Sequence, residues 1–120
     1  MRNISFSMTK EQFRDGSKDV TRRLGWWDAE AGWMLMGCEK CQGLGPGGKI
    51  VKMGAIWLVD ARPERLDLMI RNTAYGMSEV RREGFPHMLP MEFIDFFILG
   101  HKGVTPTSMV MRLEFRHLVG

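Results

Sequence analysis

The sequence of 120 residues is poor in the residues on which metal and redox sites depend. Its two cysteines, Cys38 and Cys41, form a lone Cys-x-x-Cys pair, and its three histidines, His87, His101 and His117, stand in unrelated segments. A structural zinc site needs four ligands at suitable spacing, and a ribonuclease commonly needs a histidine pair. We therefore expect no metal, no cofactor and two reduced thiols near the end of a strand.

Long hydrophobic runs are also missing. No apolar stretch approaches the ~20 residues of a membrane-spanning helix, and residues 1–6 show no signal-peptide core. We expect a cytoplasmic protein with no membrane partner. The length suits one domain over residues 1–120. The formal net charge of +3, with eleven arginines and six lysines, permits RNA as a partner without requiring it.

The N-terminal pattern predicts a strand followed by a short helix. Residues 4–8 alternate between apolar and polar side chains, so that Ser5 and Ser7 share a polar side that could border a site. The segment Thr9-Lys10-Glu11-Gln12 has the pattern of a capping box, and Gly16 is a suitable helix end.

The remaining patterns predict an α+β domain. Strands are expected at residues 33–40, 50–61 and 109–116, with Pro63 ending the second of them, and helices at 75–83 and 90–99. The glycine-rich segment 42–49 is expected to be a hairpin turn, and the phenylalanines of the second helix are expected to pack in the core. Antiparallel strands with helices grouped at one end indicate a small, highly curved sheet or barrel.

Most of the chemistry lies in residues 16–23, Gly-Ser-Lys-Asp-Val-Thr-Arg-Arg. Lys18 can act as a base if its ammonium is destabilised, Thr21 can attack or polarise a carbonyl, and Arg22 and Arg23 can bind anions or carbonyl oxygens. In a straight strand Lys18 and Thr21 would point to opposite faces, because they are three residues apart. We therefore predict an irregular turn or bulge between Ser17 and Val20.

The same segment resembles the Gly-x-Lys-x-x-Thr-x-Arg signature of the ASCH family, which consists of small domains with a PUA-like β-barrel. Its four named positions are filled by Gly16, Lys18, Thr21 and Arg23. Residues 21–26, Thr-Arg-Arg-Leu-Gly-Trp, resemble the small bacterial and phage branch, and residues 80–93 resemble the second helical region of the family. The resemblance implies one PUA-like domain: a small curved β-barrel with short helices packed at its ends.

A bacterial branch of that family hydrolyses the amide of N(4)-acetylcytidine to cytidine and acetate, using a lysine, a threonine and a glutamate. The resemblance assigns these roles to Lys18, Thr21 and Glu83. It leaves open whether Thr21 is the nucleophile or orients the attacking water. Glu79 is a rival for the acid role, and Glu39, expected at the centre of a strand, is a further acid that could face the cleft.

The environment of Lys18 decides whether this chemistry is feasible. Burial beside Arg22 and Arg23 would lower its pKa and supply neutral amine, whereas a simple ion pair with Glu83 would keep it charged. Arg23 or backbone amides would stabilise the oxyanion. The predicted substrate-binding residues are Arg23, Arg22, Trp26, Ser7 and Glu39.

Two other functions fit the sequence. In a non-catalytic RNA-binding module, Lys18, Arg22 and Arg23 would hold phosphates and Trp26 would stack on a base. Of the adjacent tryptophans Trp26 and Trp27, one is expected to pack in the core and the other to form a cleft wall. A ribonuclease ranks lower, because the histidines form no evident pair.

Overall fold

The computed structural model describes residues 1–41 and 43–118. Its elements, in chain order, are β1 (Arg2–Ser5), α1 (Lys10–Asp15), β2 (Val20–Arg23), β3 (Met34–Cys38), β4 (Lys52–Arg65), α2 (Leu68–Arg71), α3 (Thr73–Arg82), α4 (Pro90–Leu99) and β5 (Met109–His117). The strands form one sheet in the order β1-β3-β4-β5-β2. Gln42, the first residue of the predicted glycine-rich turn, lies outside the described residues.

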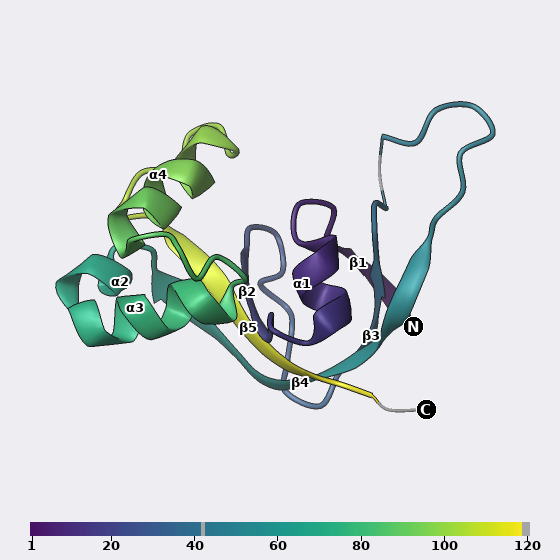
Figure 1. The fold of residues 1–120 in the computed structure, drawn as a ribbon, viewed down its shortest axis with the longest axis horizontal. Coiled ribbons are helices and arrows are strands. Elements are labelled where there is room, and N and C mark those ends of the chain that lie inside the picture. Colours follow the sequence, from purple (N-terminus) through teal and green to yellow (C-terminus); the bar gives the residue numbers. More distant parts are fainter. Residues whose placement is uncertain (42, 119–120) are drawn as a thin grey trace.

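The sheet is curled, with α1 on its concave side and α2, α3 and α4 grouped at one end (Figure 1). This arrangement confirms the predicted α+β class with a small curved sheet and short helices. The expectation of antiparallel strands is wrong for one pair, because β1 and β3 run parallel while the other three pairs are antiparallel. Strands β3 and β4 form the predicted hairpin.

Two strand boundaries differ from the prediction. Strand β1 ends at Ser5, whose partner Cys38 is the last residue of β3, and Met8 is 71% exposed instead of facing the core. Strand β4 continues through Pro63 to Arg65. Proline is tolerated there because β4 pairs only with β5 beyond the end of β3, so one edge of this part of β4 needs no N–H donor.

The helices at 73–82 and 90–99 confirm the two predicted ones, and the four-residue α2 was not predicted. Helix α1 is present, and Gly16 at φ 82° ends it. The predicted capping box does not form there: the side chain of Thr9 makes no capping hydrogen bond, and Gln12 Nε2 donates instead to the carbonyl of Gly84, at 3.1 Å. This bond ties α1 to the turn that follows α3.

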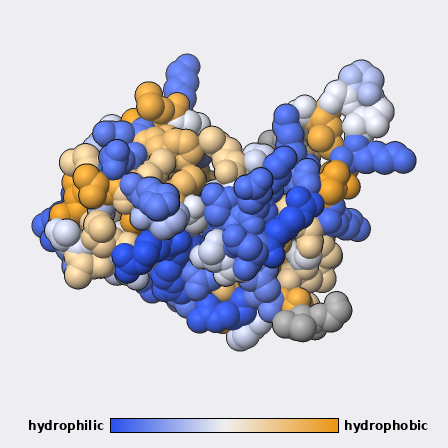
Figure 2. Space-filling view, in the orientation of Figure 1, coloured by the Kyte–Doolittle hydropathy of each residue, from blue (hydrophilic) through white to orange (hydrophobic). Residues whose placement is uncertain are grey.

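Two apolar clusters form the core. The first packs α1 onto the sheet, where the ring of Phe13 stacks on Phe6 at 4.5 Å. Gly37 of β3 is required at this contact, because a Cβ atom there would overlap the Phe13 ring. The second cluster joins α2, α3 and α4 to Val110 of β5. Figure 2 shows apolar residues gathered over this helical end and hydrophilic residues over the middle of the molecule.

Cys38 and Cys41 are both free thiols, as expected. Burial raises the pKa of Cys38 to about 11, and its interaction with Cys41 adds to the rise. Within the described residues, no helix is long and apolar enough to cross a membrane.

Candidate active site

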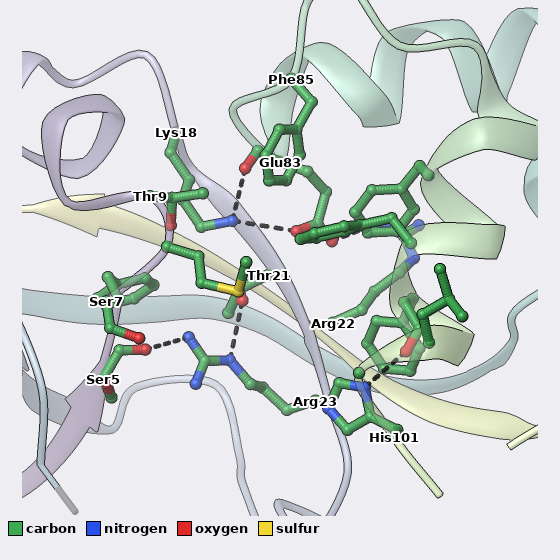
Figure 3. Close-up of a pocket in the computed structure, with 17 residues that line it drawn as sticks. Ser5, Ser7, Thr9, Lys18, Thr21, Arg22, Arg23, Glu83, Phe85 and His101 are labelled. Carbon is green, nitrogen blue, oxygen red and sulfur yellow. Dashed lines mark hydrogen bonds and ion pairs between the residues drawn. The ribbon is translucent and has the colours of Figure 1, made fainter. Parts of the chain in front are cut away.

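A cavity of about 530 Å³ lies between the concave side of the sheet and the helical end (Figure 3). Residues of both apolar clusters line it, including Phe6 from the first and Phe93 from the second. Lys18, Thr21 and Glu83 line the same cavity, although they come from separate segments. The three residues proposed for catalysis are therefore brought together.

The backbone before β2 explains how Lys18 and Thr21 reach one cavity. Residues 17–19 have no regular secondary structure, as predicted for the segment between these two side chains. The amide of Asp19 donates to the carbonyl of Arg82 at the end of α3, at 3.0 Å. This contact holds the irregular segment against the helical end, and both side chains then face the cavity.

Lys18 is 2% exposed and forms an ion pair with Glu83. Its Nζ donates to the carbonyl oxygen of Glu83 at 2.7 Å and to Oε1 at 3.0 Å. Burial lowers the pKa of Lys18; the carboxylate of Glu83 opposes this, and the nearby charges of Arg23 and Arg22 lower the pKa further. The net direction is downward, so the ion pair and a lowered lysine pKa occur together.

Glu83 also belongs to a buried group of charges that we call the ionic cluster, made of Arg22, Arg112, Glu64, Glu79 and Glu83. The guanidinium of Arg22 lies at its centre, with 0% of its side chain exposed. It donates to Glu64 Oε2 at 2.7 Å, to Glu79 Oε1 at 2.7 Å and to Glu83 Oε2 at 3.1 Å.

The ionic cluster removes Arg22 and Glu79 from the list of substrate-contacting residues. Burial alone would lower the pKa of Arg22, but Glu83, Glu64 and Glu79 together raise it, so this guanidinium stays charged. Arg22 lines the cavity, but its Nη1 and Nη2 donate to carboxylates, and its buried Nε has no hydrogen-bond partner among the described residues. Glu79 is 1% exposed, accepts hydrogen bonds from Arg22 and Arg112, and does not line the cavity. Of the candidate acids, Glu83 is the one at the cavity.

Arg23, unlike Arg22, is hydrogen-bonded to hydroxyl and carbonyl oxygens instead of carboxylates. Its Nε donates to Thr21 Oγ1 at 3.0 Å and its Nη2 donates to the carbonyl of Ser5, so it links the two edge strands β2 and β1. Within residues 1–41 and 43–118 it has no carboxylate partner and its Nη1 has no hydrogen bond. Burial lowers the pKa of Arg23 to about 10. The cavity thus contains a guanidinium able to bind an oxygen atom.

Aromatic rings form the wall facing these polar groups. Phe85 packs against Phe93 at 5.9 Å and against Phe96 at 5.4 Å, and Phe97 continues the wall. The prediction of core packing holds for Phe93 and Phe97, which are buried, yet the same rings also line the cavity. Sequence reasoning missed the wall because helical periodicity does not show which flank of an apolar face stays uncovered.

Two predicted substrate-binding residues lie elsewhere. Trp26 packs on the first apolar cluster beneath the guanidinium of Arg2, 3.9 Å from its ring centroid, and does not line the cavity. Its neighbour Trp27 is 53% exposed and does not line it either. Glu39 follows β3 instead of lying within a strand, and its carboxylate binds Arg14 at 2.7 Å.

Several further residues line the cavity. Ser7 lines the cavity as expected, together with Ser5. Thr9, Leu99 and His101 also line it, and the sequence assigned them no role in the site. Thr9 and His101 lie in connections and Leu99 is the last residue of α4, so no local pattern marks them.

Comparison of the chain with protein-family models, with curated proteins and with solved structures gave no match. A lysine of lowered pKa, a hydroxyl, a carboxylate and an uncompensated guanidinium face an aromatic wall. This combination suits a planar ligand that carries a polar, reactive group.

Proposed function

We propose that the chain is a metal-independent amidohydrolase of the ASCH type, with a PUA-like curved barrel. It would hydrolyse the N4-acyl amide of N4-acetylcytidine, or of a related acylated cytosine nucleoside, to cytidine and a carboxylate. The observation that carries the proposal is the convergence of Lys18, Thr21 and Glu83 on one cavity. The curled five-stranded sheet with helices at one end is compatible with this fold.

The cavity has two sides that suit an acylated cytosine. The planar base stacks on the wall formed by Phe85 and the rings of α4, since base-to-aromatic stacking contributes about 1–3 kcal/mol per base. The exocyclic amide then faces Lys18, Thr21 and Arg23. The partner of the protein is accordingly a small modified nucleoside.

The ion pair of Lys18 and Glu83 supplies the base and the acid. When the ligand fills the cavity and excludes water, a proton passes from Lys18 Nζ to Glu83 Oε1, which accepts its hydrogen bond at 3.0 Å. This transfer leaves a neutral amine and a protonated carboxyl. The lowered pKa of Lys18 favours it.

The neutral amine of Lys18 next accepts a proton from the nucleophile, which is either Thr21 Oγ1 or a water that Thr21 orients. Thr21 Oγ1 already accepts a hydrogen bond from Arg23 Nε, so its own proton is available to a base. In the described residues Lys18 Nζ is bonded to Glu83 and not to Thr21, so this proton reaches Lys18 through a bridging water. A bond forms to the acyl carbon, and the carbonyl oxygen becomes an oxyanion. Arg23 stabilises this oxyanion.

Collapse of the intermediate breaks the bond between the acyl carbon and N4, and Glu83 gives its proton to N4. Cytidine leaves, and Lys18 and Glu83 return to their charged forms. If water attacks, acetic acid is released and ionises to solvent. If Thr21 attacks, its acetyl ester reacts with water by the same proton transfers, and the hydroxyl is regenerated.

The test is the ultraviolet absorbance of N4-acetylcytidine mixed with the purified chain and no added metal. The wild type is expected to remove the acylcytosine band. Lys18→Ala and Thr21→Ala should each lower kcat/KM by about 10²–10⁴-fold, because a general base or its partner is lost. Lys10→Ala, which changes an exposed lysine of α1, is the matched control. Intact mass spectrometry of a quenched reaction detects an acetylated Thr21 if Thr21 is the nucleophile.

A wild type that binds cytidine but leaves the acylcytosine band intact would contradict hydrolysis. Salt-dependent binding of single-stranded RNA would then favour the RNA-binding alternative. That alternative is weakened here because two of its contacts are missing: Arg22 is enclosed by carboxylates and Trp26 lies outside the cavity.

A further inference from the structure

The cavity has a buried end and an open end. Lys18 is 2% exposed, and Thr21 and Glu83 are each 3% exposed. Leu99, which lines the same cavity at the end of α4, is 88% exposed. The segment 99–101 therefore lies at one place where the cavity meets solvent, and Met8, which is 71% exposed, marks another.

His101 is held rigidly in that segment. Its ring stacks on Phe97, with centroids 4.2 Å apart and planes at 20°. Its Nδ1 lies 2.8 Å from the carbonyl oxygen of Phe97. A carbonyl oxygen only accepts hydrogen bonds, so Nδ1 carries the proton and Nε2 of the neutral ring is an acceptor.

The Nε2 atom of His101 has no hydrogen-bond partner in the described part of the chain. Figure 3 shows the imidazole across the cavity from Ser5 and Ser7, with the side chain of Arg23 between them. The open end thus presents one oriented acceptor to whatever part of a ligand reaches it.

The geometry points to His101 as the acceptor for a 2′- or 3′-hydroxyl of ribose. This inference rests on the proposed function. In cytosine, the exocyclic N4 and the sugar-bearing N1 lie on opposite sides of the ring. An amide at the buried end, beside Lys18 and Thr21, therefore directs the sugar towards the open end and His101. The substrate class is then an acylated ribonucleoside.

The charges of the cavity lining disfavour a nucleotide as the ligand. The cationic side chains of the lining are Lys18, Arg22 and Arg23, and none of them belongs to the segment 99–101. Lys18 and Arg22 are paired with carboxylates, and Arg23 is hydrogen-bonded to β1 and β2. Lys102 is exposed and does not line the cavity. Arg23 has no carboxylate partner in the described part of the chain, but the proposed reaction uses it for the oxyanion. A 5′-phosphate would therefore gain no additional cation from this lining, and the free nucleoside is the preferred ligand.

Calorimetric titration with the reaction product measures this preference without turnover. The wild type is expected to bind cytidine about two- to tenfold more tightly than 2′,3′-dideoxycytidine, the ratio expected for one hydrogen bond. Cytidine 5′-monophosphate should bind no more tightly than cytidine. His101→Phe keeps an aromatic ring but removes the acceptor, and its cytidine to dideoxycytidine ratio should fall to about one. His87→Phe, an exposed histidine outside this cavity, is the control and should keep the wild-type ratio.

The outcomes separate this inference from the proposed function. Equal affinity of the wild type for cytidine and dideoxycytidine would overturn the role of His101 even if N4-acetylcytidine is hydrolysed, and so would an unchanged ratio in His101→Phe. The expected ratios without any hydrolysis would support a ribonucleoside-binding cavity and contradict the amidohydrolase. The wild-type ratios need no variant, so the test does not depend on whether His101→Phe folds.

Discussion

Arg22 and Arg23 are neighbours in β2 and both line the cavity, yet their guanidiniums have their partners in two different regions of the molecule. Arg22 is at the centre of the ionic cluster and contacts three carboxylates, whereas Arg23 has no carboxylate partner among the described residues. Adjacent strand residues point to opposite faces, so the two guanidiniums meet different neighbours. The same residue type therefore contributes to stability in one region and is available for chemistry in the other.

The two regions are joined by Glu83. One of its carboxylate oxygens accepts from Lys18 at the cavity, and the other accepts from Arg22 in the ionic cluster. The cluster thus fixes the orientation of the proposed acid. A change in the cluster is expected to alter both folding and the site, whereas a change at Arg23 should mainly alter the site.

The largest effect on stability is expected from a substitution that breaks the ionic cluster. Arg22→Ala leaves three buried carboxylates short of a cation and should lower the free energy of unfolding by about 3–5 kcal/mol. Arg23→Ala removes two hydrogen bonds and should cost roughly 1–2 kcal/mol. Urea unfolding of both variants measures the difference. Equal losses would mean that the two arginines do not divide stability and chemistry between them.

The next largest effect is expected on the stability of the fold at low pH. Burial alone would raise the pKa of Glu79, but hydrogen bonds and charge from Arg112 and Arg22 outweigh it and hold the pKa at about 2, below the ordinary value of 4.5. The unfolded chain then binds more protons than the folded one, so stability is lost as pH falls from about 5 to 2. The loss should reach about 3 kcal/mol.

Urea unfolding at pH 6 and at pH 2.5 tests the acid prediction. Glu79→Gln cannot lose this contribution and should show a shallower decline between the two pH values, even though it starts from a lower stability. A decline as steep as that of the wild type would show that other carboxylates cause the acid sensitivity.

The smallest effect is expected from a substitution at Glu39, which lies outside the cavity. Glu39→Gln breaks a half-exposed ion pair with Arg14 outside the cavity and should change the free energy of unfolding by at most about 1 kcal/mol. Its kcat/KM for N4-acetylcytidine should stay within about twofold of the wild type, since no group at the cavity is altered. A tenfold loss of turnover would return Glu39 to the candidates for the acid.

Local signals predicted some elements well. Helix α4 begins at Pro90 and ends before Gly100, because proline at the first position and glycine after the last are signals that need no tertiary partner. The extent of β1 and β4 was not predictable in this way. Met8 leaves the sheet because β3 ends opposite Ser5. Strand β4 passes through Pro63 because, in the described part of the chain, no strand pairs with its other edge there.

The residues of the site also differ in whether local signals predicted them. Lys18 and Thr21 were predicted from their side-chain chemistry and from the resemblance of their segment to the ASCH signature, and their spacing predicted the irregular backbone before β2. The sequence did not decide which of Glu83, Glu79 and Glu39 is the acid. That choice depends on which arginine or lysine reaches each carboxylate in the folded chain.

The sequence by itself determined the α+β class, the irregular segment before β2 and the candidacy of Lys18 and Thr21, because these depend on residue type and short-range spacing. The tertiary structure alone decided that Arg22 is paired with three carboxylates and that Arg23 has none among the described residues. It also placed Trp26 outside the site and put the rings of α4 and His101 inside it. Burial and charge pairing are properties of packed neighbours from distant segments, and no local pattern encodes them.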